Sequence, residues 1–201
     1  MQEFIRERLQ EAVSVKKQIL KDAQVLEQIS SVTEQLWNVI AKDHSIYFCG
    51  NGGSAADAQH LATELSGRFL ENRRAIKSEA LGTNMAFTTA VGNDFSFDRI
   101  FARSLEALGR PGDALVLLST SGNSANVLKA AVQAKKMNVL TICLTGASGE
   151  ALADLCDFSI KVPSLSVPRI QEAHMLLGHI ICEHLEHSLI TLKPDISYES
   201  S

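Results

Sequence analysis

Apolar residues recur at intervals of three and four through the first 42 residues of the chain. This spacing predicts amphipathic helices, and the polar pair Ser30 and Ser31 predicts a break between two of them. The apolar stripes are too narrow to enclose a core by themselves. We therefore expect these N-terminal helices to pack on the rest of the chain and on partner subunits.

From residue 45 onward the pattern changes to short, continuous apolar runs that end in turns rich in glycine, serine or proline. Four such runs occupy residues 45–49, 114–118, 139–144 and 158–162, and residues 76–81 form a weaker fifth candidate. Continuous apolar strands that alternate with helix-compatible segments are typical of a parallel sheet with both faces covered. The sequence thus predicts an α/β fold.

The last long element is predicted to be a helix from about Pro168 to Ile190, because proline suits a first helical turn. The sequence contains no linker long enough to separate a second domain, and no internal repeat. We divide the chain into N-terminal helices (1–42), one α/β domain (43–191) and a polar tail (192–201).

The composition is that of an ordinary globular protein, with 201 residues of which 45% are hydrophobic and 21% charged. The net charge of −4 and the aromatic content of 5% disfavour a general nucleic-acid binder. No apolar run approaches the ~20 residues that span a bilayer, so we expect no membrane association. Four cysteines lack any metal-ligand spacing, and we expect them to be reduced core residues of a cytoplasmic protein. They are Cys49, Cys143, Cys156 and Cys182.

Two predicted strands end in loops that suit a phosphate group. The loop 119–124, Ser-Thr-Ser-Gly-Asn-Ser, offers four hydroxyls, a glycine and the amino end of a following helix. It has no lysine, so it is not a nucleotide P-loop, and the alternative is a turn that only caps its helix. A second loop, 50–54 (Gly-Asn-Gly-Gly-Ser), favours phosphate binding, because open α/β sheets bind ligands at the carboxyl ends of their strands.

The helix expected after the second loop carries Asp57, His60 and Glu64 at spacings of three and four, which places them on one face. A histidine and a glutamate one turn apart can bind a divalent metal or transfer protons, although such a pair is often only a solvated surface pair. Gln171 and His179 of the last helix are eight residues apart, about 80° around its axis, so both could face one site. If the two helices converge beyond the strand ends, they offer two imidazoles, a carboxylate and an amide oxygen to one site.

Together these segments resemble the SIS (sugar isomerase) family, and closely its phosphoheptose isomerases. The resemblance is carried by CGNGGSAADAQHLATELSGRF (49–69), VGNDFSF (91–97), LSTSGNSANVLKA (118–130) and RIQEAH (169–174), followed by His179. It implies a three-layer, flavodoxin-like SIS domain with a five-stranded, mainly parallel sheet. It also implies a homotetramer with active sites near the subunit interfaces.

The resemblance further implies the residues of the site. Glu64 and His179 correspond to the family's proposed acid–base pair, and one zinc ion per subunit would bind through His60, Glu64, Gln171 and His179. Contacts to a sugar phosphate fall on Asn51, Gly52, Gly53, Ser54, Glu64, Arg68, Asn93, Asp94, Ser119, Thr120, Ser121, Ser124 and Gln171. The chain departs from some members at Pro168, where they carry an acidic residue. A role for that carboxylate is absent here or is filled by another group.

The activity that the resemblance implies is conversion of sedoheptulose 7-phosphate to D-glycero-D-manno-heptose 7-phosphate, the first step toward the ADP- or GDP-heptose of lipopolysaccharide core or capsule. This aldose–ketose isomerisation passes through an enediol(ate). It needs a base at carbon, a group that exchanges protons with the oxygens, and stabilisation of oxyanion charge. Glu64 can supply the base, His179 the acid–base partner and zinc the electrophile.

Two alternatives belong to other classes of function. A non-catalytic relative binds the bacterial replication initiator, but that group lacks the glutamate and the second histidine that are present here. A regulatory SIS module that senses phosphosugars usually accompanies a DNA-binding domain, and nothing in this chain resembles one. The isomerase is therefore the preferred interpretation.

Overall fold

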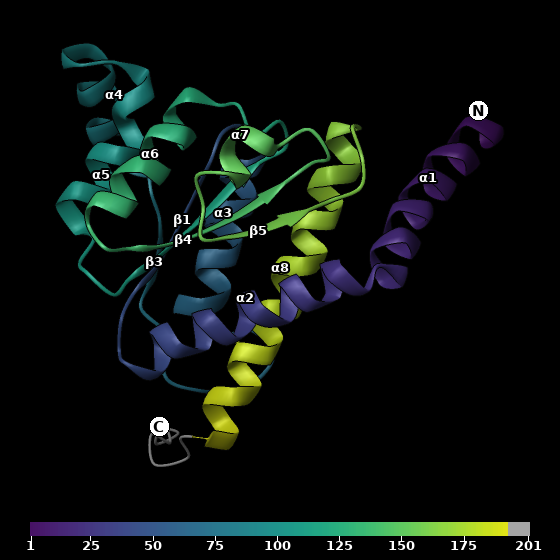
Figure 1. Ribbon diagram of the computed structural model, residues 1–201, viewed down its shortest axis with the longest axis horizontal. Helices are drawn as coiled ribbons and strands as arrows, with labels where there is room; N and C mark the ends of the chain where they lie inside the picture. The colour runs from purple at the N-terminus through teal and green to yellow at the C-terminus, as the bar shows by residue number, and fades with distance from the viewer. Residues whose placement is uncertain (193–201) are drawn as a thin grey trace.

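The continuous apolar runs form the strands of a parallel sheet (Figure 1). In the computed structural model, which describes residues 1–192, five strands pair in the order β2-β1-β3-β4-β5. They are β1 (Ile46–Gly50), β2 (Ser78–Ala80), β3 (Ala114–Ser119), β4 (Leu140–Thr145) and β5 (Phe158–Lys161). Every neighbouring pair is parallel. The predicted sheet is confirmed, and the weak candidate at residues 76–81 supplies β2.

Helices cover both faces of the sheet, as Figure 1 shows. One layer consists of α1 (Gln2–Lys21), α2 (Ala23–Ala41), α3 (Gly53–Ser66) and α8 (Val167–Leu192). The other layer consists of α4 (Met85–Asp94), the 3-10 helix η1 (Phe97–Arg99), α5 (Ile100–Leu108), α6 (Ala125–Lys136) and α7 (Glu150–Ala153).

Neighbouring side chains of the strands alternate between the two apolar clusters that these layers enclose. Phe48 and Val116 belong to the cluster with α3 and α8, whereas Cys49 and Leu117 belong to the cluster with α5 and α6. This alternation follows from the two-residue period of a strand, and it explains why the strands read as uninterrupted apolar runs. The predicted three-layer α/β architecture is confirmed.

The break between the two N-terminal helices lies at Asp22, so the predicted break near Ser30 and Ser31 is wrong. Asp22 has an extended backbone, and its carboxylate accepts hydrogen bonds from the N–H groups of Gln24 (3.0 Å) and Val25 (3.2 Å). An aspartate cap of this kind starts a helix efficiently. Serine inside a helix costs only a few tenths of a kcal/mol, so the serine pair does not interrupt α2.

The long C-terminal helix is confirmed as α8. The predicted polar tail falls almost entirely on residues 193–201, which lie outside the described residues. All four cysteines lie within the described part and are free; Cys156 is partly exposed and the other three are buried. No helix within residues 1–192 is both long and apolar enough to cross a membrane.

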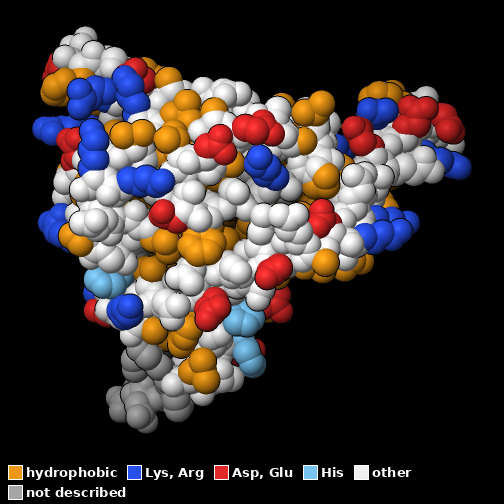
Figure 2. Space-filling model, viewed as in Figure 1, with side chains coloured by type: hydrophobic (Ala, Val, Ile, Leu, Met, Phe, Trp, Pro, Cys, Tyr) orange, Lys and Arg blue, Asp and Glu red, His pale blue; other side chains and the backbone are white. Residues whose placement is uncertain are grey.

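The first helix, α1, projects from the body of the molecule (Figure 1). Only Val15 and Ile19 of its 20 residues are buried. Figure 2 shows hydrophobic side chains at the surface along this projecting arm. The helix therefore keeps most of its apolar stripe uncovered within one chain.

Candidate active site

The helices α3 and α8 lie side by side on one face of the sheet and run in the same direction. Glycines sit at two of their contacts. A Cβ atom on Gly178 would lie 2.6 Å from Leu61 Cδ2, and one on Gly53 would lie 2.2 Å from Gln171 Nε2. Since real Cβ atoms do not approach so closely, these glycines allow the two helices to come together.

Three side chains with metal-binding or proton-transfer chemistry meet between these helices: His60 and Glu64 of α3, and His179 of α8. The Nε2 atoms of the two histidines lie 3.0 Å apart, and His60 Nε2 lies 3.1 Å from Glu64 Oε1. The ligand atoms all lie within 4.8 Å of one another. The His60 side chain is 49% exposed and that of Glu64 21%, so a ligand can reach the cluster from solvent.

This donor set fits a zinc ion. Two imidazole nitrogens on a tetrahedral zinc ion lie about 3.3 Å apart, close to the separation of the two Nε2 atoms here. The carboxylate of Glu64 supplies a third donor of a type that zinc accepts. Gln171, the fourth ligand that the resemblance implies, lies instead against Gly53, about 12 Å along α8 from His179.

The two helices do converge, but the place where they meet is not beyond the strand ends. The Leu65 carbonyl, next to Glu64, accepts a hydrogen bond from Ile76 N–H, two residues before β2 begins. Ser78 of β2 pairs with Ile46, the first residue of β1, so this end of α3 is level with the amino ends of the strands. A helix that starts at the end of β1 and runs back for 14 residues spans about 21 Å, longer than the strand itself. The cluster therefore lies alongside the sheet.

The loop 119–124 has the compact shape expected of an anion-binding turn. Ser119 Oγ accepts from Gly122 N–H (3.1 Å), and Ser121 Oγ accepts from Asn123 N–H (3.3 Å). Gly122 has a φ of +65°, and a Cβ there would lie 2.5 Å from a Cα atom of the neighbouring loop, so only glycine fits. Ser124 precedes α6 but makes no side-chain capping bond. A turn that only caps its helix would use that hydroxyl.

A pair of amides joins the loop that follows β1 to the first turn of α6. Asn51 Nδ2 donates to Asn126 Oδ1, and Asn126 Nδ2 donates to Asn51 Oδ1, both at 2.8 Å. Asn126 is only 3% exposed. The sequence marks Asn51 as a substrate contact, but in the structure its amide is engaged with Asn126, which sequence reasoning missed. In the same loop, 50–54, the predicted contacts Gly52 and Gly53 are exposed and Ser54 is buried.

Comparison with known proteins identifies the family of the chain. A family model of the SIS domain matches residues 9–146. The phosphoheptose isomerase of Aneurinibacillus thermoaerophilus is 42% identical over 193 residues, which cover 96% of this chain and 98% of that protein. That of Rhodospirillum rubrum is 56% identical over 144 residues, or 72% of this chain and 77% of that protein. The chain belongs to the phosphoheptose isomerase family. The solved phosphoheptose isomerase of Neisseria gonorrhoeae superposes with a TM-score of 0.87 at 38% identity, over 92% of this chain and 98% of that one.

Three residues that the family resemblance marks as substrate contacts lie apart from the cluster within one chain. Asn93 and Asp94 are exposed at the end of α4, in the helical layer on the other face of the sheet, where their side chains bond to each other at 2.9 Å. Arg68 is also exposed, just after α3, and donates to the Leu70 carbonyl at 3.4 Å. Within one chain, Asn93 and Asp94 therefore do not share a site with His60, Glu64 and His179.

Two neighbours of the cluster complete its surroundings. Burial raises the pKa of the Asp57 carboxyl, against the effect of nearby His60, and among the described residues its Oδ2 atom has no hydrogen-bond partner. Asp57 shares the helix but is not part of the cluster that His60, Glu64 and His179 form. Phe69 stacks on His179, with ring centroids 5.6 Å apart and an interplanar angle of 30°. Sequence reasoning missed Phe69, because nothing in its local pattern indicates a contact 110 residues away.

Proposed function

We propose that this chain isomerises sedoheptulose 7-phosphate to D-glycero-D-manno-heptose 7-phosphate through an enediol(ate) intermediate. The convergence of His60, Glu64 and His179, in a chain of this family, carries the proposal. The product would enter ADP- or GDP-heptose synthesis for lipopolysaccharide core or capsule. The free cysteines are in keeping with a cytoplasmic enzyme.

The reaction moves one proton between C1 and C2 of the sugar. Glu64 removes the proton from C1 of the ketose and returns it to C2, which gives the aldose. His179 exchanges protons with the two sugar oxygens as the enediol(ate) forms and collapses. His60 lies within 3.1 Å of Glu64 Oε1 and 3.0 Å of His179 Nε2, so it holds the two groups in one geometry.

Zinc is part of the proposal. His60, Glu64 and His179 would hold one ion per subunit, and a side chain that binds the ion cannot act as a free base at the same time. Gln171, the fourth ligand that the resemblance implies, lies against Gly53 about 12 Å along α8 from His179 and would have to move toward the cluster. A zinc ion held by these residues would supply a Lewis acid able to stabilise negative charge on the sugar oxygens. The metal content of the purified protein tests the site directly, and His60→Gln should lower it without unfolding the chain. Full activity of the metal-free protein would show that zinc takes no part in the reaction, and the acid–base assignment of Glu64 and His179 would still stand.

The phosphate would bind at the loop 119–124, which carries the hydroxyls of Ser119, Thr120, Ser121 and Ser124 and leads into the amino end of α6. Serine hydroxyls, backbone N–H groups and the helix dipole together can bind a dianion without a lysine. Gly52, Gly53 and Ser54 lie on the neighbouring loop, which the Asn51–Asn126 pair joins to the first turn of α6.

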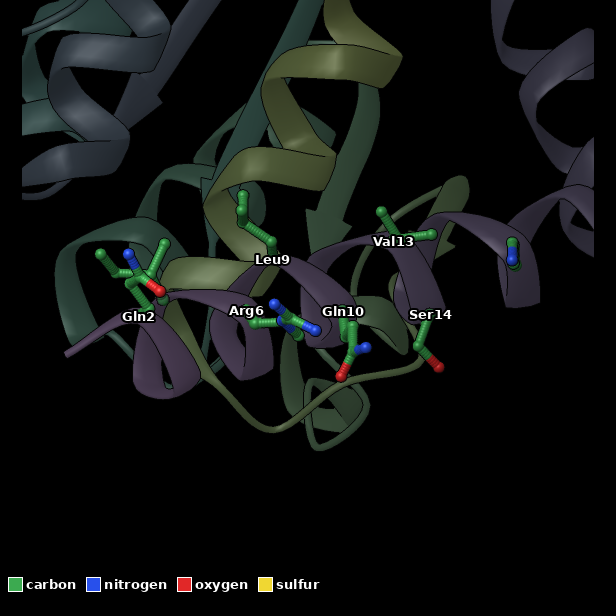
Figure 3. A pocket seen from close by; sticks show the side chains of 8 residues that line it. Gln2, Arg6, Leu9, Gln10, Val13 and Ser14 are labelled. Carbon is green, nitrogen blue, oxygen red and sulfur yellow. The ribbon is translucent and has the colours of Figure 1, made fainter.

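We also propose a homotetramer, because α1 presents an uncovered apolar face. A hollow of ≈ 580 Å³ lies along this helix. Figure 3 shows side chains that line it, Leu9 and Val13 among them. Leu9 is 62% exposed and Val13 48%. Because about half of each side chain is already covered, its burial against another copy would stabilise the assembly by about 1 kcal/mol. Light scattering should give a mass near four times 21.8 kDa. A monomer with normal turnover would contradict a site shared between subunits.

The decisive experiment is to incubate the purified protein with sedoheptulose 7-phosphate and to follow the aldose by NMR. Glu64→Gln and His179→Gln nearly conserve shape, so each should abolish turnover while the thermal midpoint stays near that of the wild type. The loss should appear in kcat more than in KM, because these groups act in the transition state. If both variants remain fully active, the acid–base assignment is wrong.

A further inference from the structure

A buried ion pair joins Glu186 of α8 to Arg73, which lies in the segment between α3 and β2. Arg73 Nε lies 3.0 Å from Glu186 Oε1, and the two side chains are 2% and 3% exposed. Buried charges are costly unless they are paired and fully hydrogen-bonded. The contacts that compensate this pair indicate what it does for the protein.

Glu186 of α8 binds three consecutive backbone N–H groups. Its Oε1 accepts from Phe69 at 2.9 Å, and its Oε2 accepts from Leu70 at 2.6 Å and from Glu71 at 2.9 Å. Burial opposes ionisation of this carboxyl, but the three amides and Arg73 outweigh it, so its pKa lies below the ordinary value. A fixed carboxylate therefore shapes the start of the segment and places the backbone of Phe69.

Arg73 binds the other side of the segment, at the carboxyl end of α3. Its Nη2 donates to the Glu64 carbonyl at 2.7 Å, and its Nη1 donates to the carbonyls of Leu65 at 2.9 Å and Gly67 at 3.2 Å. Carbonyls at a helix end lack partners within the helix and carry its negative dipole end, so a guanidinium is well suited to this position. The ion pair thereby ties the end of α3 to α8.

Both ends of this connection reach the catalytic cluster. Glu186 lies seven residues after His179 on α8, two turns along and on the same face. Phe69, whose N–H it binds, stacks on the His179 ring. On α3, one of the two residues whose carbonyls Arg73 binds is Glu64 itself.

We infer that Phe69, Arg73 and Glu186 are positioning residues, which fix the His179 ring and the Glu64 side chain relative to each other. The kinetic part of this inference rests on the proposed isomerase activity. Phe69 sets the orientation of the imidazole by stacking, and the ion pair holds the two helices in register. A displacement of about 1 Å between reacting groups can lower turnover up to about 100-fold, so such residues affect catalysis without touching substrate.

Three variants and a control separate a positioning role from a general effect on stability. Phe69→Leu keeps an apolar side chain but removes the aromatic ring, whereas Phe69→Tyr keeps the ring. Glu186→Gln keeps the shape but removes the charge. The matched control is Asp113→Asn: Asp113 is 3% exposed and accepts from the N–H groups of Ser45 and Arg110, both at 2.8 Å, at the amino end of β3.

We expect Phe69→Leu and Glu186→Gln to lower kcat by about tenfold with KM changed by less than about twofold, and Phe69→Tyr to keep the wild-type kcat. Asp113→Asn should lower the thermal midpoint and leave kcat unchanged. A wild-type kcat in Phe69→Leu would overturn the inference. So would an equal loss of kcat in Asp113→Asn and Glu186→Gln, since that would mean general destabilisation.

A second measurement does not depend on turnover. The Phe69 ring should displace the NMR signal of the His179 ring in protein labelled with 13C-histidine, a signal assigned by its loss in His179→Gln. Phe69→Leu and Glu186→Gln should move this signal, and Asp113→Asn should not. If the wild type fails to convert the sugar phosphate but the signal moves as expected, the proposed function fails and the positioning stands. A signal that stays in place in both variants would overturn the positioning, whatever the activity.

Discussion

The reciprocal amide pair of Asn51 and Asn126 joins the loop after β1 to the first turn of α6. A double-mutant cycle can measure the strength of this pair. Two hydrogen bonds of 2.8 Å connect the side chains. Each contributes about 0.5–1.5 kcal/mol net, so the coupling free energy between Asn51→Ala and Asn126→Ala should be about 1–3 kcal/mol. Asn126→Ala alone should be the more destabilising single change, because Asn126 Oδ1 also accepts from Val127 N–H at 3.0 Å.

The assay is urea unfolding of the wild type, the two single variants and the double variant, at one protein concentration because an oligomer's stability depends on it. The exposed pair Arg103 and Glu106, bonded at 2.8 Å, serves as a control and should couple by less than about 0.5 kcal/mol. Each amide variant should also raise KM for the sugar phosphate, because the loop after β1 is no longer held to the first turn of α6. Additive effects within about 0.3 kcal/mol would refute the reasoning, since they would mean that the amides do not act as a pair.

Two further predictions test the packing around α3 and α8. Gly53→Ala would place a Cβ 2.2 Å from Gln171 Nε2, so the amide must move; we expect a folded protein with turnover lowered on the order of tenfold, and an unchanged turnover would show that the position of Gln171 is unimportant. Burial lowers the pKa of His174 to about 4. In the unfolded chain this histidine has a pKa of about 6.5, so as the pH falls the unfolded chain is protonated at His174 before the folded chain is. The free energy of unfolding should therefore fall by up to about 3 kcal/mol as the pH drops from about 6.5 to about 4. Urea unfolding of His174→Gln should lack this part of the pH dependence, and an identical pH profile in wild type and variant would contradict the assignment.

The strands and the order of layers could be predicted because they depend on local pattern. The run before Ser119 is buried along its whole length, and each residue contributes to that signal by being apolar. The break at Asp22 was missed for a different reason. A cap depends on two specific hydrogen bonds from Asp22, whereas a pair of serines looks like an interruption and is compatible with a continuous helix.

The site was only partly predictable. The spacing of His60 and Glu64 shows that they share one face of α3. It does not show where along the length of the sheet that face meets α8. That position depends on where α3 and α8 approach most closely, and Gly53 and Gly178 set the approach. In the sequence these two glycines are separated by 125 positions, and only the folded chain makes them part of one contact.

Glu186 shows most clearly why the remaining parts of the site escape sequence reasoning. It lies between His184 and His187 in a stretch that reads as a polar helix face, yet it is 2% exposed. Its partners are the N–H groups of residues 69–71, more than 110 positions earlier. Those three donors point to one carboxylate, and without α8 each of them would lose a hydrogen bond to a charged acceptor, which is stronger than one to a neutral group. Ordering of the segment after α3 therefore requires docking of α8, and the same step brings His179 to His60 and Glu64.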